Sequence, residues 1–278
     1  MSSSDERILS TGSRMRVGEK EEQRNERLFG TSSPVAFVTG SHAARVGSVI
    51  ASLFEANGFR VVRHAHRDPG SQSGGMLLNG AIEDEETCLL WSEKIMSTYG
   101  RIDVAVNSAA IWDNKPLEEL KAVDFKRQFD VNAIGTALIC KNFGLIMVNQ
   151  ETGGAIVNIG DWAIRRPYPG FAAYFASKAA VKGITESMAI ELATRNGNVR
   201  VNSVLPGPVL YDESVAPEKR EQIAKSCLLQ RNGSAEDVAD AVLYLATAPF
   251  VTGVMLPVDG GRTVFSGQST DSLAHPGS

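Results

Sequence analysis

The segment Val35–Gly47, with the sequence VAFVTGSHAARVG, decides the fold of this chain. Its apolar, valine-rich start is typical of a strand that is buried on both faces of a parallel sheet. Thr39 and Gly40 end that strand, and an amphipathic pattern over Arg45–Asn57 begins almost at once. A strand that turns through glycine into a helix presents free backbone N–H groups to a phosphate. On these residues alone, Gly40 and Gly47 could equally do no more than build a tight turn.

The same alternation of short β-branched runs and amphipathic stretches continues downstream. It is typical of βαβ units, whose right-handed crossovers wind strands and helices into one layered domain. We therefore predict a single-domain, doubly wound (Rossmann) α/β fold with a seven-stranded parallel sheet, helices on both faces and ligands at the carboxyl ends of the strands. The predicted strands are Val35–Thr39, Arg60–Ala65, Met76–Ala81, Asp103–Asn107, Ala155–Ile159, Val199–Leu205 and Val254–Val258, with helices that include Arg45–Asn57, Glu85–Tyr99 and Tyr174–Arg195.

Composition narrows the classes of partner. The 278 residues are 43% hydrophobic and 22% charged, as in a soluble globular protein. The net charge of −4 offers no general basic surface, so we expect neither nucleic acid nor a membrane as partner. Cys88, Cys140 and Cys227 are widely spaced, which argues against a disulfide framework and a metal site. With no apolar stretch long enough to span a bilayer, the expected location is the cytoplasm.

The two ends of the chain differ from the part between them. Residues 1–33 mix acids and bases with few apolar side chains, so we expect a mobile leader there. A short helix over Lys20–Leu28 that forms on a partner is the alternative. Residues 34–265 form the predicted catalytic domain, and the Ser- and Gly-rich residues 266–278 form a flexible tail.

The end of the second strand bears on the choice of cofactor. An acid at this place usually binds the ribose hydroxyls of NAD, whereas the additional phosphate of NADP needs cationic partners. Here the run is His64-Ala65-His66-Arg67, followed by Asp68. The planar guanidinium of Arg67 can grip a phosphate, so NADP(H) is favoured over NAD(H). The alternative is that Arg67 is an ordinary solvated charge.

Four polar residues are candidates for catalysis. Tyr174 and Lys178 are four apart at the start of a predicted helix, so their side chains share one face. Asp161 lies just beyond a predicted strand, and Asn132 belongs to the preceding helical segment. We expect these four side chains to converge.

On the basis of these residues and the motifs around them, the chain resembles the short-chain dehydrogenases/reductases from about Pro34 to Phe265. That family implies that Tyr174 donates the proton, that Lys178 lowers the tyrosine pKa and holds the nicotinamide ribose, and that Asn132 supports a water relay. The matching motifs are Thr39-Gly40, Asn107-Ser108-Ala109-Ala110, Asn132, Tyr174-x-x-x-Lys178, Pro206-Gly207 and Asp259-Gly260-Gly261.

The resemblance and the preceding arguments together give a set of cofactor-binding candidates. The phosphate loop is one residue longer than the usual family pattern, so we expect it to bulge, and Ser108 stands where an asparagine is usual. The candidates are Gly40, Ser41, Arg45, Val46, Gly47, His64, His66, Arg67, Asn107, Ala109, Tyr174, Lys178, Pro206 and Gly207.

Asp161 departs from the general family pattern, which has serine at this place. An ionised carboxylate accepts hydrogen bonds but cannot donate one to a carbonyl oxygen, so it suits a substrate with N–H groups, such as a protonated C=N bond. This Asp-Tyr-Lys variant is similar to the pteridine and dihydromonapterin reductases, which reduce pterin rings with NADPH. By that resemblance, Trp112 stacks on a flat substrate. We also expect the stretch Val209–Ser226, the substrate loop with Tyr211 near its start, to close over the substrate. The alternatives are a Trp112 packed under the substrate loop and an Asp161 that only caps a loop.

The sequence thus predicts an NADPH-dependent reductase of C=N (pterin-like) or C=O groups. One alternative is a general carbonyl or polyol oxidoreductase in which a buried, protonated Asp161 donates as serine does. Another is a non-catalytic NADPH-binding regulator. The family pattern further implies a homo-oligomer, a tetramer, built from the helical regions Asp124–Met147 and Tyr174–Arg195.

Overall fold

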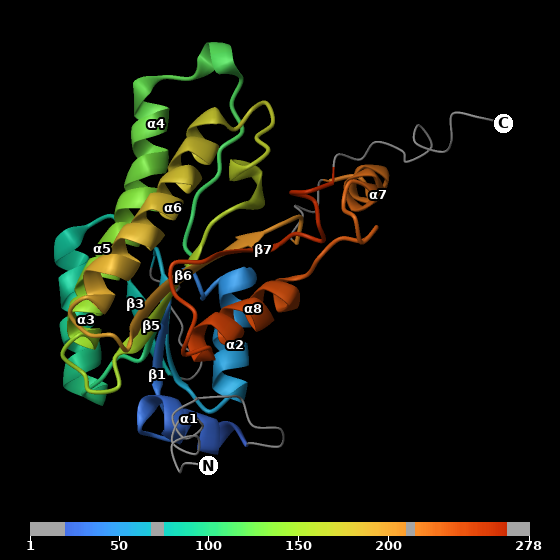
Figure 1. Cartoon of the computed structure of the whole chain (residues 1–278). Coiled ribbons are helices and arrows are strands. Elements are labelled where there is room, and N and C mark those ends of the chain that lie inside the picture. The colour runs from blue at the N-terminus through green and yellow to red at the C-terminus, as the bar shows by residue number, and fades with distance from the viewer. Residues whose placement is uncertain (1–19, 68–74, 210–214, 266–278) are drawn as a thin grey trace, which may run out of the picture.

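Seven parallel strands form one sheet, as the sequence predicts, and their order in the sheet is β3-β2-β1-β4-β5-β6-β7. Figure 1 shows the sheet with helices packed around it. The computed structural model describes residues 20–67, 75–209 and 215–265. Every predicted strand is present, with ends that differ by a residue or two. The strands are β1 (Val35–Val38), β2 (Arg60–Ala65), β3 (Met76–Asn79), β4 (Val104–Asn107), β5 (Gly154–Ile159), β6 (Val199–Pro206) and β7 (Met255–Val258).

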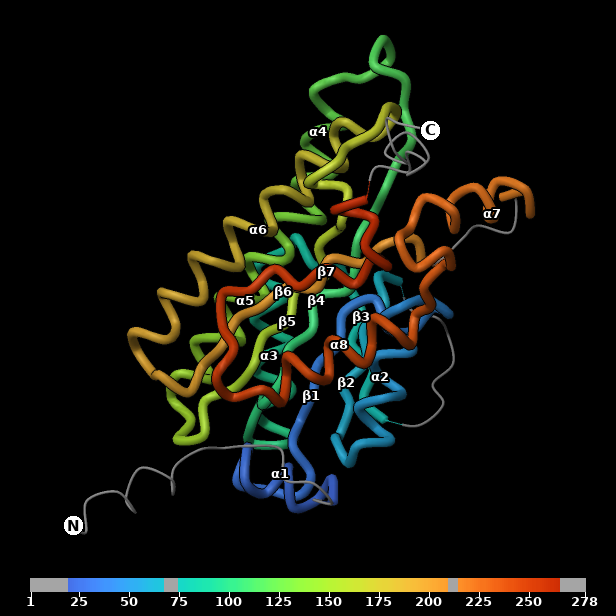
Figure 2. Tube along the Cα trace, turned by 45° about the vertical axis from the view of Figure 1, so that its right-hand side comes forward, coloured from blue at the N-terminus to red at the C-terminus, as the bar shows by residue number. Residues whose placement is uncertain are grey.

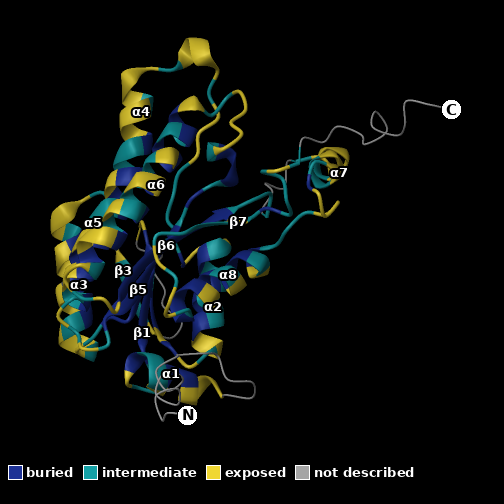
Figure 3. Cartoon of the chain, in the orientation of Figure 1, coloured by how far each residue is buried: buried dark blue, intermediate teal, exposed yellow. Residues whose placement is uncertain are grey.

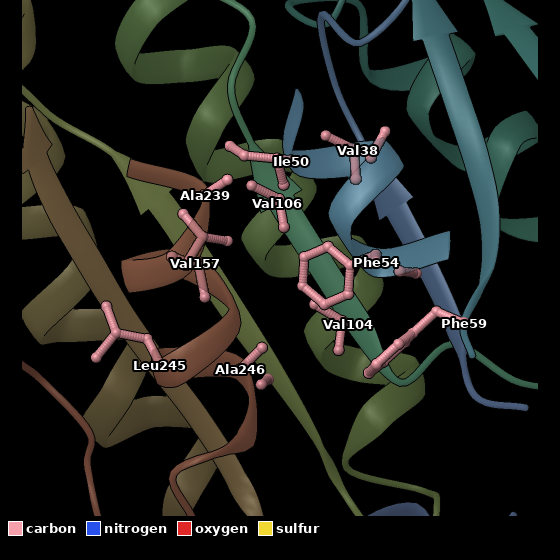
Figure 4. Packing of buried hydrophobic residues seen from close by; sticks show 14 of the residues in the cluster. Val38, Ile50, Phe54, Phe59, Val104, Val106, Val157, Ala239, Leu245 and Ala246 are labelled. Carbon is pink, nitrogen blue, oxygen red and sulfur yellow. The ribbon is translucent and has the colours of Figure 1, made fainter. Parts of the chain in front are cut away.

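Helices cover both faces of this sheet. On one face lie α2 (Val46–Ala56) and α8 (Ala235–Thr247), and on the other lie α3 (Glu85–Tyr99), α5 (Thr136–Met147) and α6 (Ala172–Ala193). Each face has its own apolar core. Phe54 and Leu245 are fully buried in the first, whose packing Figure 4 shows, and Figure 3 shows how burial concentrates in the central strands. The sheet is thus buried on both sides, as the runs of valine and isoleucine predict.

The helical region predicted over Asp124–Met147 is divided into three parts. It comprises α4 (Ala122–Phe129), a π-helical stretch over Asp130–Gly135, and α5. Such π-helical turns in a helix often occur at functional sites. This one holds Asn132, so the irregular turn coincides with a residue that the sequence singles out.

Residues 20–33 correct the prediction of a mobile leader that extends to residue 33. Glu21–Phe29 forms helix α1, which lies at the end of the molecule where β1 begins (Figure 2). Asn25 is fully buried and donates to the carbonyl oxygen of Asn57 over 2.9 Å. The ring of Phe29 packs edge-on against Phe59 at 5.6 Å. Few apolar residues suffice here because α1 binds through buried polar contacts, which composition does not reveal.

The remaining elements are short and lie toward the carboxyl ends of the strands. They are the single turns Leu117–Glu119 and Trp162–Ile164 and helix α7 (Pro217–Lys225). Because all seven strands are parallel, their carboxyl ends share one edge of the sheet, and the loops that follow them are neighbours. Within the described ranges, no helix combines the length and the apolar character needed to cross a bilayer.

Candidate active site

The loop between β1 and α2 is shaped for close approach by a ligand. Gly40 has a φ of +63°, and a Cβ atom at this residue would lie 2.8 Å from the Cα of Ala109. At Gly47 a Cβ would lie 2.5 Å from the carbonyl oxygen of Gly40. The loop contains a tight turn in which the N–H of Arg45 donates to the carbonyl oxygen of Ala43 over 2.7 Å, while the predicted bulge stays a prediction. The loop then passes into the N-terminus of α2, whose N–H groups suit a phosphate.

Two of the predicted cofactor contacts, Ser41 and His64, are committed to the protein itself. The ring Nδ1 of His64 accepts from the N–H of Gly40 over 3.0 Å, and Nε2 lies 3.1 Å from the carbonyl oxygen of Gly80. These partners fix the neutral tautomer with the proton on Nε2. Burial lowers the pKa of His64 to about 4. Ser41 is fully buried, and its hydroxyl donates to Val38 over 2.7 Å. Both side chains therefore position the loop, and neither offers a free polar atom to a cofactor.

A cavity of about 490 Å³ lies beside this loop, next to the end of β2. Four of the predicted cofactor residues line it, namely His64, His66, Arg67 and Ala109. Lys126 of α4 also lines it, as does the acid Glu83. The side chains suit the adenosine half of a dinucleotide, and the tight approach at Gly40 and Gly47 suits its pyrophosphate, so the residues present fit this cofactor.

The neighbouring strand ends complete the floor of the cleft. The hydroxyl oxygen of Thr39 accepts from the N–H groups of Ser108 and Ala109 over 2.9 and 3.0 Å. Asn107 is buried and donates to the side chain of Asn158 over 2.8 Å, so it joins β4 to β5.

The predicted Pro206-Gly207 pair lies at the end of β6. The N–H of Gly207 donates to the carbonyl oxygen of Val258 over 2.9 Å. A Cβ at Gly207 would lie 2.6 Å from the Cα of Asp259, so only glycine fits this crossing. The turn that begins at Asp259 is thereby held against the end of β6.

Asp161 and Tyr174 meet as the sequence predicts. The hydroxyl of Tyr174 donates to Oδ2 of Asp161 over 2.8 Å, while Oδ1 accepts from the N–H of Ala163 over 2.7 Å. Burial raises the pKa of Asp161, although these hydrogen bonds and the charges of Lys178 and Arg262 oppose that effect. Asp161 does cap the loop, as the alternative proposed, through the hydrogen bond that Oδ1 accepts from Ala163. Its other oxygen, Oδ2, accepts from Tyr174.

Lys178 lies on the same face of α6, one turn beyond Tyr174. Its ammonium donates to the carbonyl oxygen of Ile159 over 2.7 Å, and burial lowers its pKa to about 8. The pKa of Tyr174 lies well above its ordinary value because the phenol is buried and faces the charge of Asp161. Burial and the charge of Asp161 thus set the direction of the tyrosine pKa, and the expectation that Lys178 lowers it stays a prediction.

Asn132 ties three elements of the site together. Its side-chain oxygen accepts from the N–H of Ile111 over 2.9 Å, and its nitrogen lies 2.9 Å from the hydroxyl oxygen of Ser177. Ser177 in turn donates to the carbonyl oxygen of Tyr174 over 2.7 Å. Asn132 thus joins the loop after β4 to the first turn of α6.

Trp112 stands on that same loop and is 52% exposed. The segment expected to close over the substrate includes residues 210–214, which lie outside the described residues, so packing of Trp112 under that segment is not tested. The guanidinium carbon of Arg45 lies 4.7 Å from the centre of its ring, so the phosphate loop and the aromatic side chain meet across the cleft. Tyr211, the other predicted substrate contact, lies outside the described residues.

The structure adds three side chains that the sequence analysis did not identify. Trp162 directly follows Asp161, and its ring is stacked with that of Tyr168 at 6.3 Å. The guanidinium carbon of Arg262 lies 4.4 Å from the centre of the Trp162 ring. The Asp259-Gly260-Gly261 motif pointed to this segment, but nothing in the sequence indicated that the next residue, Arg262, stacks on Trp162.

The comparisons agree with this geometry. The family model described as enoyl-(acyl carrier protein) reductase matches residues 41–263. This chain is a member of the short-chain dehydrogenase/reductase family. A short-chain dehydrogenase/reductase of Aspergillus oryzae, astE, is 31% identical over 259 residues, which are 86% of this chain and 98% of that protein.

Two further members of the family have more specific names. Human 3-oxoacyl-[acyl-carrier-protein] reductase is 31% identical over 223 residues, which cover 78% of this chain and 92% of that enzyme. The ligand-free structure of aldohexose dehydrogenase from Thermoplasma acidophilum superposes with a TM-score of 0.76 at 28% identity, and covers 88% of this chain and 96% of the other. The chain is accordingly an oxidoreductase of a family that uses nicotinamide dinucleotides, while the names of these relatives do not include a pterin.

Proposed function

We propose that the protein is an NADPH-dependent reductase of C=N groups in pterin-like heterocycles. The hydrogen bond of 2.8 Å between Tyr174 and Asp161 carries this proposal. An ionised Asp161 would accept a hydrogen bond from a substrate N–H, whereas it would repel the negative charge that develops on a ketone oxygen. The exposed ring of Trp112 supports a flat substrate, which it can stack on.

Each catalytic side chain then has one task. A bound NADPH supplies the hydride. Tyr174 supplies the proton, directly or through a water molecule ordered by Asp161. Lys178, held at Ile159, brings a positive charge to the site, and Asn132 keeps the first turn of α6 in register with the loop that bears Trp112.

The preference for NADPH over NADH rests on the cavity of about 490 Å³ at the end of β2. His66 and Arg67 line it, and a guanidinium binds phosphate through two parallel hydrogen bonds. Glu83 lines the same cavity and opposes an additional phosphate, so Arg67 must outweigh it. We further propose that the protein is cytoplasmic. We also propose that it is a homotetramer built from the α4–α5 and α6 regions, and sedimentation at micromolar concentration would test this oligomeric state.

General carbonyl reduction is the second candidate, and one observation favours it. Burial raises the pKa of Asp161, and a protonated Asp161 could donate a hydrogen bond to a carbonyl oxygen as serine does. One relative, carbonyl reductase family member 4 of Xenopus tropicalis, is 38% identical over 169 residues, 61% of this chain and 70% of its own. The pH profile separates the candidates. If the neutral acid is active, the rate falls as pH rises through the pKa of Asp161, and if the carboxylate is active, it falls as pH decreases through that pKa.

The deciding experiment measures turnover of a dihydropterin and of a simple ketone, with NADPH and with NADH, on the native protein and on Asp161→Ser. We expect the substitution to lower kcat/KM for the dihydropterin by about 10- to 100-fold, because a charged hydrogen-bond partner is lost, and to leave or improve ketone reduction. Better dihydropterin turnover by Asp161→Ser would refute the role assigned to the carboxylate. Binding of NADPH without turnover of any substrate would point instead to a regulator.

A further inference from the structure

Arg262 stands in a turn whose backbone is tightly held. The carboxylate of Asp259 accepts from the N–H of Gly261 over 2.9 Å and from that of Thr263 over 2.7 Å. Gly261 has a φ of +80°, and a Cβ there would lie 2.8 Å from the Cβ of Leu228. The carbonyl oxygen of Arg262 accepts from Arg166 over 2.7 Å. The chain thus fixes the point from which this side chain projects.

The side chain of Arg262 stacks on Trp162, the residue that directly follows the catalytic acid Asp161. Its guanidinium carbon lies 4.4 Å from the centre of the Trp162 ring, and Trp162 is 7% exposed. Burial raises the pKa of both Asp161 and Tyr168, and the positive charge of Arg262 opposes that rise at each group. The face of the guanidinium is therefore occupied by the indole, while its N–H groups make no hydrogen bond to the rest of the described chain.

Asp161 and Arg262 influence each other without forming a pair. In residues 20–67, 75–209 and 215–265, the carboxylate of Asp161 accepts from Ala163 and Tyr174 and joins no ion pair. Among these residues the acid therefore has no cationic partner, and the guanidinium that stacks on the next residue, Trp162, has no acceptor, so one ligand can satisfy both groups. Such a ligand has an N–H group for the acid and an anionic acceptor for the fork-shaped donors of arginine.

We propose that Arg262 is a substrate-binding residue that receives a carboxylate group of the substrate. The inference rests on the proposed function, in which Asp161 takes the N–H of the reacting C=N group, and it narrows the substrate class. The preferred substrate is a flat cyclic imine that carries a carboxylate on or next to the C=N carbon. Asp161 and Arg262 bind the two ends of this unit, and Tyr174 lies beside the bond that is reduced.

The test compares matched substrates on three variants. One pair is a dihydropterin with and without a carboxylate on its C=N carbon, and the other is an α-oxo acid and the methyl ketone of the same skeleton. Arg262→Met keeps an apolar stem over Trp162 and removes the charge, Arg262→Lys keeps the charge, and Arg165→Met removes an exposed cation of the neighbouring loop as the control. Thermal unfolding and NADPH binding report whether each variant is folded.

We expect the native protein to prefer the carboxylated member of a pair. Arg262→Met should lower kcat/KM for that member by about 10- to 100-fold and for the uncharged member by less than about threefold, Arg262→Lys should recover part of the loss, and Arg165→Met should change neither. An equal loss for both members, or no preference in the native protein, overturns the assignment. If the native protein reduces dihydropterins equally with and without the carboxylate, only the role assigned to Arg262 is refuted. If it reduces only α-oxo acids, and Arg262→Met loses the preference for the carboxylate, only the C=N proposal is refuted.

Discussion

His64 makes the stability of this protein dependent on pH. Its side chain is buried with the ring packed beside those of Phe37 and Trp91, and the residue is 1% exposed. Both ring nitrogens have backbone partners, at Gly40 and Gly80. Burial lowers its pKa from 6.5 to about 4 in the folded chain. Above pH 6.5 the histidine is neutral in both states and its contribution is fully present. As pH falls toward 4, only the unfolded chain takes up the proton, so the contribution is lost.

The loss over this range is about 3 kcal/mol, because each unit of pKa shift corresponds to about 1.4 kcal/mol. Urea unfolding followed by tryptophan fluorescence from pH 7 to about 4.5 measures it, with His64→Gln as the variant that cannot titrate and His42→Gln as an exposed control. We expect the native protein and His42→Gln to lose stability in parallel, and His64→Gln to lose about 2–3 kcal/mol less over the same range. Equal losses in all three proteins would refute the claim that His64 is neutral in the folded chain and has a hydrogen-bond partner at each ring nitrogen.

Two further predictions concern the cofactor cavity and helix α1. Arg67→Ala should raise KM for NADPH by about 10- to 100-fold and change KM for NADH by less than about threefold, as measured by initial rates. An equal rise in KM for both cofactors would show that Arg67 does not bind the additional phosphate of NADPH. Asn25→Ala should lower the free energy of unfolding by about 1–3 kcal/mol, since it removes a buried donor from Asn57, whereas the exposed Gln23→Ala should change it by less than about 0.5 kcal/mol. If the two variants prove equally stable, α1 is not anchored through Asn25.

The sequence by itself determined the architecture. Valine-rich runs such as Val35–Val38 bury both faces, and only a parallel sheet with helices on either side satisfies them. The spacing of Tyr174 and Lys178 was equally informative, because a helix places residues four apart on one face. Even Asp161, distant in sequence, was predictable, since carboxyl ends of parallel strands meet at one edge.

Only the tertiary structure decided what those residues do. The sequence predicts His64 and Ser41 as cofactor contacts, yet both side chains are buried and hydrogen-bond to the protein backbone, which holds the phosphate loop in place. Hydrogen-bond partners depend on side-chain direction, which a linear pattern does not contain. The pKa of Tyr174 is another case, since burial and Asp161 raise it although Lys178 is nearby.

Contacts between residues far apart in the chain could not be predicted from the sequence either, because a linear pattern does not contain side-chain direction. Helix α1 lies in a charged segment and docks through Asn25, a polar residue whose burial no apolar periodicity signals. Arg262 meets Trp162 a hundred residues earlier because two left-handed glycines and the carboxylate of Asp259 turn the chain back. Local sequence sets which elements form, whereas the free energy of packing them together sets which side chains share a site.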